Sequence, residues 1–382
     1  MRRISYLALV CFFALSLPAA APGAEGAVRM RRPKSHRWRE ADRQSRQRRA
    51  EAEHAAQRGK KKKTGRLEPG RWRPEVADEL ERVLDEYGAG TPEYDPGDPP
   101  VALFDWDDVS ITHHVGDALF YHLVTEAAFK FSDEFWDRVP VHFGRLRIRA
   151  GYNEFHELPP SVWPQNSYYR IYRKEFFRCY QAVCREYGRS RCALWRTKLL
   201  AGFSEDELRD YLGTVLDKEL KRPVGVEKIG TTIEDPDPVT VRVGLRWIPE
   251  MRDLYAKLRE QGFDIWVVSS ANQWAVEEMA QAYGVYPSRV AGIRLKNVDG
   301  VMTDENLLPV PVGGGQREAI VMFIGRSPRL IIGGEDGDAM LGYGRGARIR
   351  IVDSAEALPG FARLRGRSDQ PRFSPVRMPQ TR

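Results

Sequence analysis

Acidic and hydroxyl side chains directly follow three short apolar runs of this sequence. Clustered carboxylates repel one another and favour a hard cation, and oxygen ligands of this kind suit magnesium. A carboxylate can also attack phosphorus and form an aspartyl-phosphate. The pattern therefore favours magnesium-assisted phosphoryl chemistry. The residues concerned are Asp105 and Asp107 after the run 101–104, Ser269 after the run 264–268, and Glu335, Asp336 and Asp338 after the run 329–333.

Each of these signals has a purely structural alternative. An Asp that follows a strand is usually a turn residue, and a Ser in that place is more often the cap of the next helix. Together, and in this order along the chain, the three groups of residues are more specific than any one of them. If the three runs are neighbouring parallel strands, their carboxyl ends meet at one edge of the sheet, where ligands bind in folds of this class.

The elements needed to bring these residues together are indicated by the hydrophobic pattern. Fully apolar runs alternate with amphipathic segments in the second half of the chain, which predicts an α/β fold with a doubly wound parallel sheet. A helix is also expected from about residue 72 to 87, because its apolar residues recur on one face. The expected strands are 101–104, 264–269, 290–295, 329–333 and 348–352, and the later helices are 249–260, 272–283 and 316–324.

Over roughly residues 72–355 the chain resembles the haloacid dehalogenase superfamily of phosphohydrolases, particularly its secreted phosphoserine and phosphorylcholine phosphatase types. The resemblance implies that Asp105 is the nucleophile and that Asp107 is the general acid and later the base. It places Mg²⁺ on the Asp105 carboxylate and the Asp107 backbone carbonyl, and phosphate on Ser269. The segments that carry the resemblance are Leu103–Ser110, Phe263–Ser270, Gly315–Ile320 and Gly333–Leu341.

The third and fourth of these motifs depart from the family pattern. Gln316 stands where the family has a phosphate-binding Lys, and Arg317 is the neighbouring cation that could take that role. Gly334 stands where the first of two metal-binding Asp residues belongs, whereas Asp338 keeps the second place. Glu335 and Asp336 are the alternative metal ligands. Loss of the cation and of one carboxylate should weaken transition-state stabilisation.

The same resemblance implies a helical cap between the first and second motifs, which would exclude water and contact the substrate. Aromatic residues are frequent there, and they fit either a packed cap core or a cation–π box. The expected organisation is a signal peptide over 1–24, a basic disordered arm over 25–70, the start of the core over 71–110, a helical cap over 111–245, the rest of the core over 246–360 and a basic flexible tail over 361–382.

The amino-terminal segment has the three-part layout of a secretory signal peptide: two arginines, a short apolar run and small residues. We therefore expect export to the periplasm or the medium, and no transmembrane span in the mature chain. The positive net charge of +7 is concentrated in the arm that follows. This arm indicates either adhesion to an anionic envelope surface or a solvated spacer. Nucleic acid is not an expected partner.

The cysteine count limits the possible disulfides. Three cysteines remain after the expected signal peptide, so at least one is unpaired. Cys184 and Cys192 flank Gly188, a candidate helix break, and are the better pair. The alternative is three buried thiols, including Cys179.

Composition excludes full disorder and a fibrous repeat, because 42% of residues are hydrophobic and 30% are charged. The function expected from the sequence is a magnesium-dependent phosphatase for a small phosphorylated substrate. The alternative is a catalytically impaired relative that binds a ligand or partner in the cell envelope.

Overall fold

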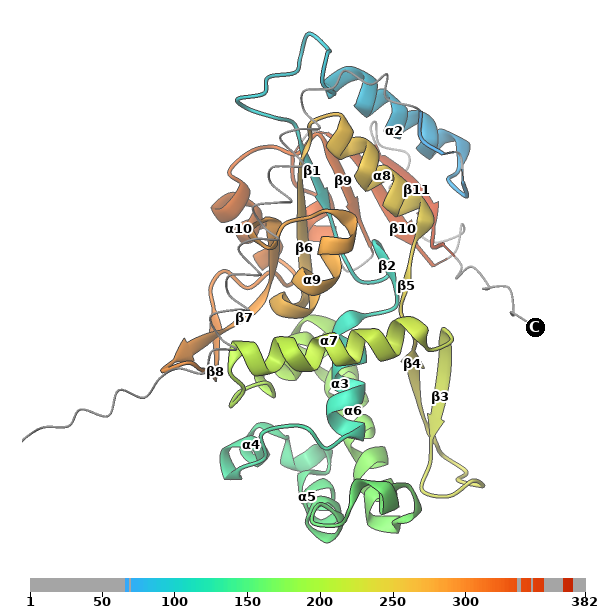
Figure 1. The fold of residues 1–382 in the computed structure, drawn as a ribbon, viewed down its shortest axis with the longest axis vertical. Helices are drawn as coiled ribbons and strands as arrows, with labels where there is room; N and C mark the ends of the chain where they lie inside the picture. Colours follow the sequence, from blue (N-terminus) through green and yellow to red (C-terminus); the bar gives the residue numbers. More distant parts are fainter. Residues whose placement is uncertain (1–65, 69, 335–337, 345, 354–366, 374–382) are drawn as a thin grey trace, which may run out of the picture. The chain divides into compact units, whose positions relative to one another are not determined.

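Four apolar residues, Val101–Phe104, form strand β1 at the centre of a seven-stranded sheet (Figure 1). The strand order is β11-β10-β9-β1-β6-β7-β8, and all neighbouring strands are parallel except β7 and β8. The doubly wound α/β fold predicted from the sequence is confirmed. The other strands are β6 (Asp264–Asn272), β7 (Val290–Val298), β8 (Val301–Leu307), β9 (Leu330–Gly333), β10 (Ala347–Val352) and β11 (Arg367–Pro371).

This computed structural model describes residues 66–68, 70–334, 338–344, 346–353 and 367–373. The expected signal peptide 1–24 and nearly all of the expected basic arm lie outside the described residues. No helix among the described residues is long and apolar enough to cross a bilayer.

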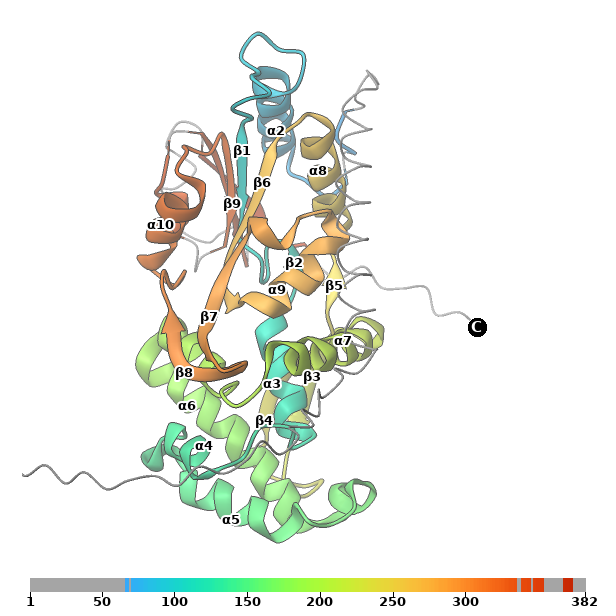
Figure 2. The same ribbon diagram turned by 60° about the vertical axis from the view of Figure 1, so that its left-hand side comes forward.

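Helices cover both faces of the sheet, which explains why the central strands β1 and β9 are apolar and buried throughout. In Figure 2 the helix α10 (Gly315–Ala319) lies on one side of β1, β6 and β9, and α2 (Pro74–Tyr87) and α8 (Pro249–Glu260) lie on the other. Alternate residues of β1 serve the two faces: Ala102 and Phe104 join the larger core with α2 and α8, and Val101 and Leu103 join the core beneath α10. Figure 2 also shows α9 (Gln273–Ala280) on the side of α8.

The chain between β1 and β6 forms a mainly helical insertion, as expected for residues 111–245. It also contains the hairpin of β3 (Gly225–Ile229) and β4 (Val239–Val243), and a short pair of β2 (Ile111–Thr112) with β5 (Arg246–Trp247). A capping box at Ser204 opens α7 (Glu205–Lys221): Ser204 Oγ accepts from the Glu207 amide, and the Glu207 carboxylate accepts from the Ser204 amide. Its helices are α3 (Val115–Thr125), α4 (Asp133–Arg138), α5 (Arg145–Phe155), α6 (Ser167–Lys198) and α7 (Glu205–Lys221).

Helix α6 is interrupted at Gly188, whose φ of 81° is in the left-handed region. A disulfide joins Cys184 to Cys192 across this interruption. The pairing preferred from the sequence is thus confirmed over the three-thiol alternative. Cys179 is a buried thiol, and burial raises its pKa to about 12.

Two expectations about the ends of the sheet are corrected. The expected strand 290–295 continues to Val298 and turns back at Asp299 and Gly300 into β8, since both turn residues adopt positive φ. The expected flexible tail 361–382 instead supplies β11, which pairs with β10. Asp369 accepts from the Arg350 guanidinium at 2.9 Å, so a polar segment without an apolar pattern is held at the edge of the sheet. Residues 361–366 and 374–382 lie outside the described residues.

Candidate active site

Asp105 lies at the carboxyl end of β1, at the point where the order of the sheet reverses. From β1 the chain continues to β6 and β7 on one side, and then crosses to β9 and β10 on the other. Such a switch point opens a crevice between the loops that leave neighbouring strands in opposite directions. The Asp105 amide donates to the Ile332 carbonyl of β9 at 2.9 Å, and its Oδ1 accepts from the Trp106 amide at 2.7 Å. Only 7% of Asp105 is exposed.

The loop after Asp105 is a tight turn that is held by hydrogen bonds to its own backbone and to the core. The Trp106 carbonyl lies 2.8–3.3 Å from the amide nitrogens of Val109, Ser110 and Ile111, all of which donate to it. Ser110 Oγ donates to the Asp105 carbonyl at 2.6 Å and lies 2.9 Å from the Tyr255 hydroxyl. These contacts hold the Asp105 backbone against the core.

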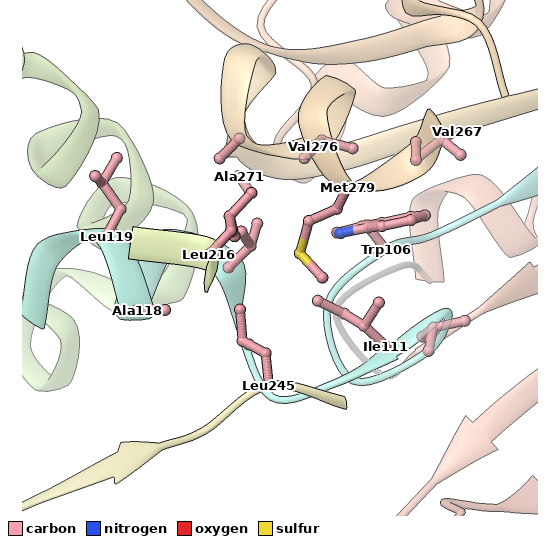
Figure 3. Packing of buried hydrophobic residues seen from close by; sticks show 14 of the residues in the cluster. Trp106, Ile111, Ala118, Leu119, Leu216, Leu245, Val267, Ala271, Val276 and Met279 are labelled. Carbon is pink, nitrogen blue, oxygen red and sulfur yellow. The ribbon is translucent and has the colours of Figure 1, made fainter. Parts of the chain in front are cut away.

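The indole of Trp106 anchors the same loop. Figure 3 shows it pointing toward Met279 and lying above Ile111. It is fully buried and meets the Tyr283 ring edge-on at 5.7 Å. The residue between Asp105 and Asp107 therefore packs into the core and fixes the loop that carries the two acids.

Asp107 is held at the amino-terminal end of α3. Its Oδ1 accepts from the Val115 amide at 2.9 Å. Burial raises the pKa of the Asp107 carboxyl to about 6, against the opposing charges of His114 and Arg196. A carboxyl with a pKa in this range can both donate and accept a proton near neutral pH, as general acid–base catalysis requires.

Asp108 has no catalytic role in the motif. Its buried carboxylate contacts three basic side chains. The Arg242 guanidinium of β4 donates to both of its carboxylate oxygens, at 2.7 and 2.5 Å. His114 Nε2 and Arg372 Nη1 approach Oδ2 at 2.9 and 3.3 Å. Burial alone would raise the pKa of Asp108, but the bonds from His114 and Arg242 hold it well below its usual range.

His114 bridges two carboxylates with its two ring nitrogens. Nε2 contacts Asp108, and Nδ1 lies 3.4 Å from Asp117 Oδ2. Burial alone would lower the pKa of His114, but the hydrogen bonds with the two carboxylates raise it to about 10. The imidazole is therefore a cation at neutral pH. No spacing signal in the sequence singles out His114, because its two carboxylate partners are identified only by the fold.

Asp117 links this histidine to helix α6. Its Oδ1 accepts from Arg196 Nη1 and from the Tyr180 hydroxyl, and Arg196 Nη1 lies 2.8 Å from that hydroxyl. The three residues are contributed by α3 and by both halves of the interrupted α6. A row of alternating charges therefore runs from the loop after β1 into the insertion, and no local pattern predicts it.

A small cavity opens beside this row, between α3, the end of α6 and the end of β6. It is lined mainly by apolar residues, among them Leu119, Phe120 and Leu200, and its polar members are Arg196, Thr197 and Asn272. Ser269 is fully buried three residues before Asn272, on β6 beside β1. Its Oγ accepts from the Ala271 amide at 3.1 Å.

The third motif places its two candidate residues on opposite faces of α10. Gln316 is buried, with 2% of its surface exposed, and its Oε1 has no hydrogen-bond partner within the described residues. Arg317 is exposed, and its Nε donates to the Ala339 carbonyl of α11 (Asp338–Leu341) at 3.0 Å. The helix directs Gln316 inward and Arg317 outward, and the role of Arg317 as a replacement for the missing Lys stays a prediction.

The fourth motif is described only in part. A Cβ placed on Gly334 would lie 3.9 Å from Asp105 Oδ2 and 3.2 Å from Val109 Cγ2, so position 334 faces the nucleophile candidate. Asp338 begins α11. Glu335 and Asp336, the alternative metal ligands, lie outside the described residues.

These residues do not complete a magnesium site within the described ranges. No group of three or more His, Cys, Asp or Glu side chains in that part of the chain is arranged to hold a metal ion. Asp105 and Asp107 offer carboxylate oxygens, but Asp107 Oδ1 already accepts from the α3 amide. Magnesium normally retains water and one or two carboxylates in such sites. The described donors therefore form at most part of its coordination shell.

Comparison with known proteins identifies the fold. No family model matches the sequence, and no curated protein matches it. A conserved protein of unknown function from Anaerococcus prevotii DSM 20548 aligns with a TM-score of 0.68 and 23% identity, over 78% of this chain and 90% of that chain. A substrate-bound phosphoserine phosphatase complex aligns with a TM-score of 0.33 and 12% identity, over 66% and 85% of the two chains. The second likeness is too low to support an argument. The first shows that this chain shares the fold of a solved protein.

Proposed function

We propose that this protein is a haloacid dehalogenase-like hydrolase that cleaves a small phosphomonoester through an aspartyl-phosphate. One observation carries the proposal: Asp105 and Asp107 follow the central strand at the switch point of the sheet, and burial raises the pKa of Asp107 to about 6. The order of the sequence motifs supports the same assignment. Its substrate class and chemistry rest on the resemblance of these motifs.

In the first step a carboxylate oxygen of Asp105 attacks phosphorus, and the bond between phosphorus and the ester oxygen breaks. The Asp107 carboxyl donates its proton to the departing alkoxide, which leaves as an alcohol. In the second step Asp107 takes a proton from water, whose oxygen attacks the phosphorus of the aspartyl-phosphate. The Asp105 carboxylate and inorganic phosphate are released.

Ser269 is the proposed phosphate contact from the neighbouring strand. We also propose Mg²⁺ as the cofactor, held by the Asp105 carboxylate and the Asp107 carbonyl, with Asp338, Asp336 or Glu335 completing the shell. When bound, the ion would offset the charge of the phosphoryl oxygens.

The direct test is phosphate release from a panel of phosphomonoesters, with Mg²⁺ and with EDTA. We expect turnover of at least one small ester that EDTA suppresses. If no ester releases phosphate, the proposed phosphatase activity is contradicted. If EDTA leaves phosphate release unchanged, only the proposed requirement for Mg²⁺ is contradicted.

A second candidate is a ligand- or partner-binding protein with impaired chemistry. The buried neutral Gln316, which stands where the resemblance places a cation, favours it. It predicts that a phosphomonoester binds measurably and is recovered intact.

Export is proposed from the amino-terminal pattern. The Cys184–Cys192 disulfide supports it, because disulfides persist mainly in oxidising compartments. Fractionation followed by amino-terminal sequencing should give a chain that begins near residues 21–28 outside the cytoplasm. Recovery of intact Met1 in the cytoplasm would contradict export. Adhesion of the basic arm to an anionic envelope surface is a further proposal, to be tested by envelope retention after deletion of residues 28–66.

A further inference from the structure

The cavity beside the candidate active site contains one buried cation, Arg196. It projects from the last turn of α6, and only 8% of its surface is exposed. Its neighbours in the cavity wall are mostly apolar, among them Leu119 and Leu200. An apolar wall lowers the local dielectric, so a charge in it acts more strongly on an entering anion than it would in water.

Hydrogen bonds at one of its two terminal nitrogens orient the guanidinium of Arg196. Nη1 makes the hydrogen bonds to Asp117 and Tyr180. Nη2 faces Gly116, where a Cβ would come within 2.2 Å of it. A glycine in the first turn of α3 is thus what allows the guanidinium to lie against this helix. Nη1 is thus engaged by Asp117 and Tyr180, whereas Nη2 lies beside Gly116, which lines the cavity together with Arg196.

Arg196 is also close enough to the proposed chemistry to influence it. Gly116 follows Val115, whose amide holds Asp107. The charge of Arg196 acts on the Asp107 carboxyl together with that of His114. On the other side, the cavity reaches Asn272, three residues beyond Ser269 on β6. The cavity therefore joins the surroundings of Asp107 to the end of the strand that carries the proposed phosphate contact.

The usual source of positive charge is absent from the third motif. Gln316 is neutral, and Arg317 is exposed and bonded to the Ala339 carbonyl. We propose that Arg196, carried by the helical insertion and oriented by Asp117 and Tyr180, is the cation that binds the phosphoryl group of the substrate in this site. The assignment rests on the proposed function and moves the cation from the core of the fold to its insertion.

Gly116→Ala tests this assignment without removing the charge. The added methyl group must displace the Nη2 end of Arg196, while alanine is favoured over glycine in a helix. The matched control is Gly213→Ala in α7, where an added Cβ meets nothing within 4 Å. Binding of inorganic phosphate to the full chain is measured by calorimetry, with thermal unfolding recorded for each variant. We expect Gly116→Ala to weaken phosphate binding roughly tenfold, as for loss of one charge-assisted contact, and Gly213→Ala to leave it unchanged.

Two further variants extend the test. One is Arg196→Lys, and the other combines Arg196→Gln with Asp117→Asn so that the charges stay balanced. Lysine keeps the charge but cannot bond Asp117, Tyr180 and a phosphate in one plane, so intermediate affinity is expected. The double variant removes both buried charges together, which avoids an unpaired Asp117, and should bind phosphate least. Folded Gly116→Ala and double variants that bind phosphate as the wild type does would overturn the proposal. So would a wild type that binds no phosphate. Phosphate binding by the wild type without ester hydrolysis would contradict only the proposed function.

Discussion

Asp108 and Arg242 form a two-pronged ion pair between the loop after β1 and the hairpin β3–β4, with N–O distances of 2.7 and 2.5 Å. The pair joins the core to the insertion directly beside the candidate catalytic residues. Because Arg372 also reaches Asp108, the segment after β11 meets the same carboxylate. A residue next to the motif thereby connects three parts of the chain.

Asp108→Asn should destabilise the protein, although the motif alone would predict that it is tolerated. Removing one partner of a buried ion pair leaves the other charges uncompensated. Arg242 is partly exposed and can reach water, so we expect a loss of about 2–3 kcal/mol in the free energy of unfolding. Urea unfolding measures it. Asp304→Asn, which breaks the more exposed pair with Arg138, should cost less than about 1 kcal/mol. Equal losses in the two variants would argue against a structural centre at Asp108.

Asp105→Asn should abolish turnover while the protein stays folded. The amide oxygen can still accept from the Trp106 amide, but the anionic nucleophile is lost. Phosphate release should fall by roughly 10³-fold or more. Asp98→Asn, at an exposed site paired with Arg326, is the control and should leave turnover unaltered. Turnover that survives in Asp105→Asn would refute the aspartyl-phosphate.

Gly334→Asp should strengthen magnesium binding. A Cβ at this position points toward Asp105 Oδ2, at 3.9 Å, so a carboxylate there would add an oxygen donor beside the nucleophile. We expect roughly tenfold tighter Mg²⁺ binding and higher activity at limiting Mg²⁺, with a further gain on adding Gln316→Lys. Gly334→Ala is the matched control, because it brings the same Cβ against Val109 without the carboxylate. If the Gly334→Ala and Gly334→Asp variants bind Mg²⁺ with the same affinity, position 334 is not part of the metal site.

Stability should fall as the pH rises above neutrality, and His114 should account for part of the fall. Its pKa is raised to about 10 by contacts with Asp108 and Asp117. A raised histidine pKa stabilises the fold fully below the unfolded value of about 6.5, and this contribution is lost as the pH approaches 10. Thermal unfolding between pH 6 and 10 measures it. His114→Gln should flatten this dependence, and His142→Gln, at an exposed histidine, should not. Parallel curves for wild type and His114→Gln would contradict the assignment.

Loss of the disulfide should loosen the second half of α6. Cys184 and Cys192 close a short loop around Gly188, one turn before Arg196. Replacing both by Ser should lower the free energy of unfolding by about 2–3 kcal/mol. Dithiothreitol should reproduce this loss in the wild type and have no further effect on the double variant. If reduction leaves the wild type's unfolding curve unchanged, the bond does not stabilise the native chain.

Local patterns in the sequence determined the secondary elements closely. Helix α8 spans the predicted residues 249–260, and β1 spans 101–104. The Ser204–Glu207 capping box and the Cys184–Cys192 pairing were also readable, because each depends on residues a few positions apart. Neighbouring residues interact through fixed helix and strand periodicities, so their spacing carries the information.

The tertiary structure alone decided which distant residues meet the predicted acids. Arg196 reaches the surroundings of Asp107 from about ninety residues further along the chain, because α6 folds back on α3. Arg367–Pro371 joins the sheet through contacts such as that of Asp369 with Arg350, although it lacks an apolar pattern. The inward position of Gln316 and the outward position of Arg317 were likewise set by how α10 packs on the sheet. Such pairings depend on the packing of whole elements, and residues distant in sequence carry no spacing signal that predicts it.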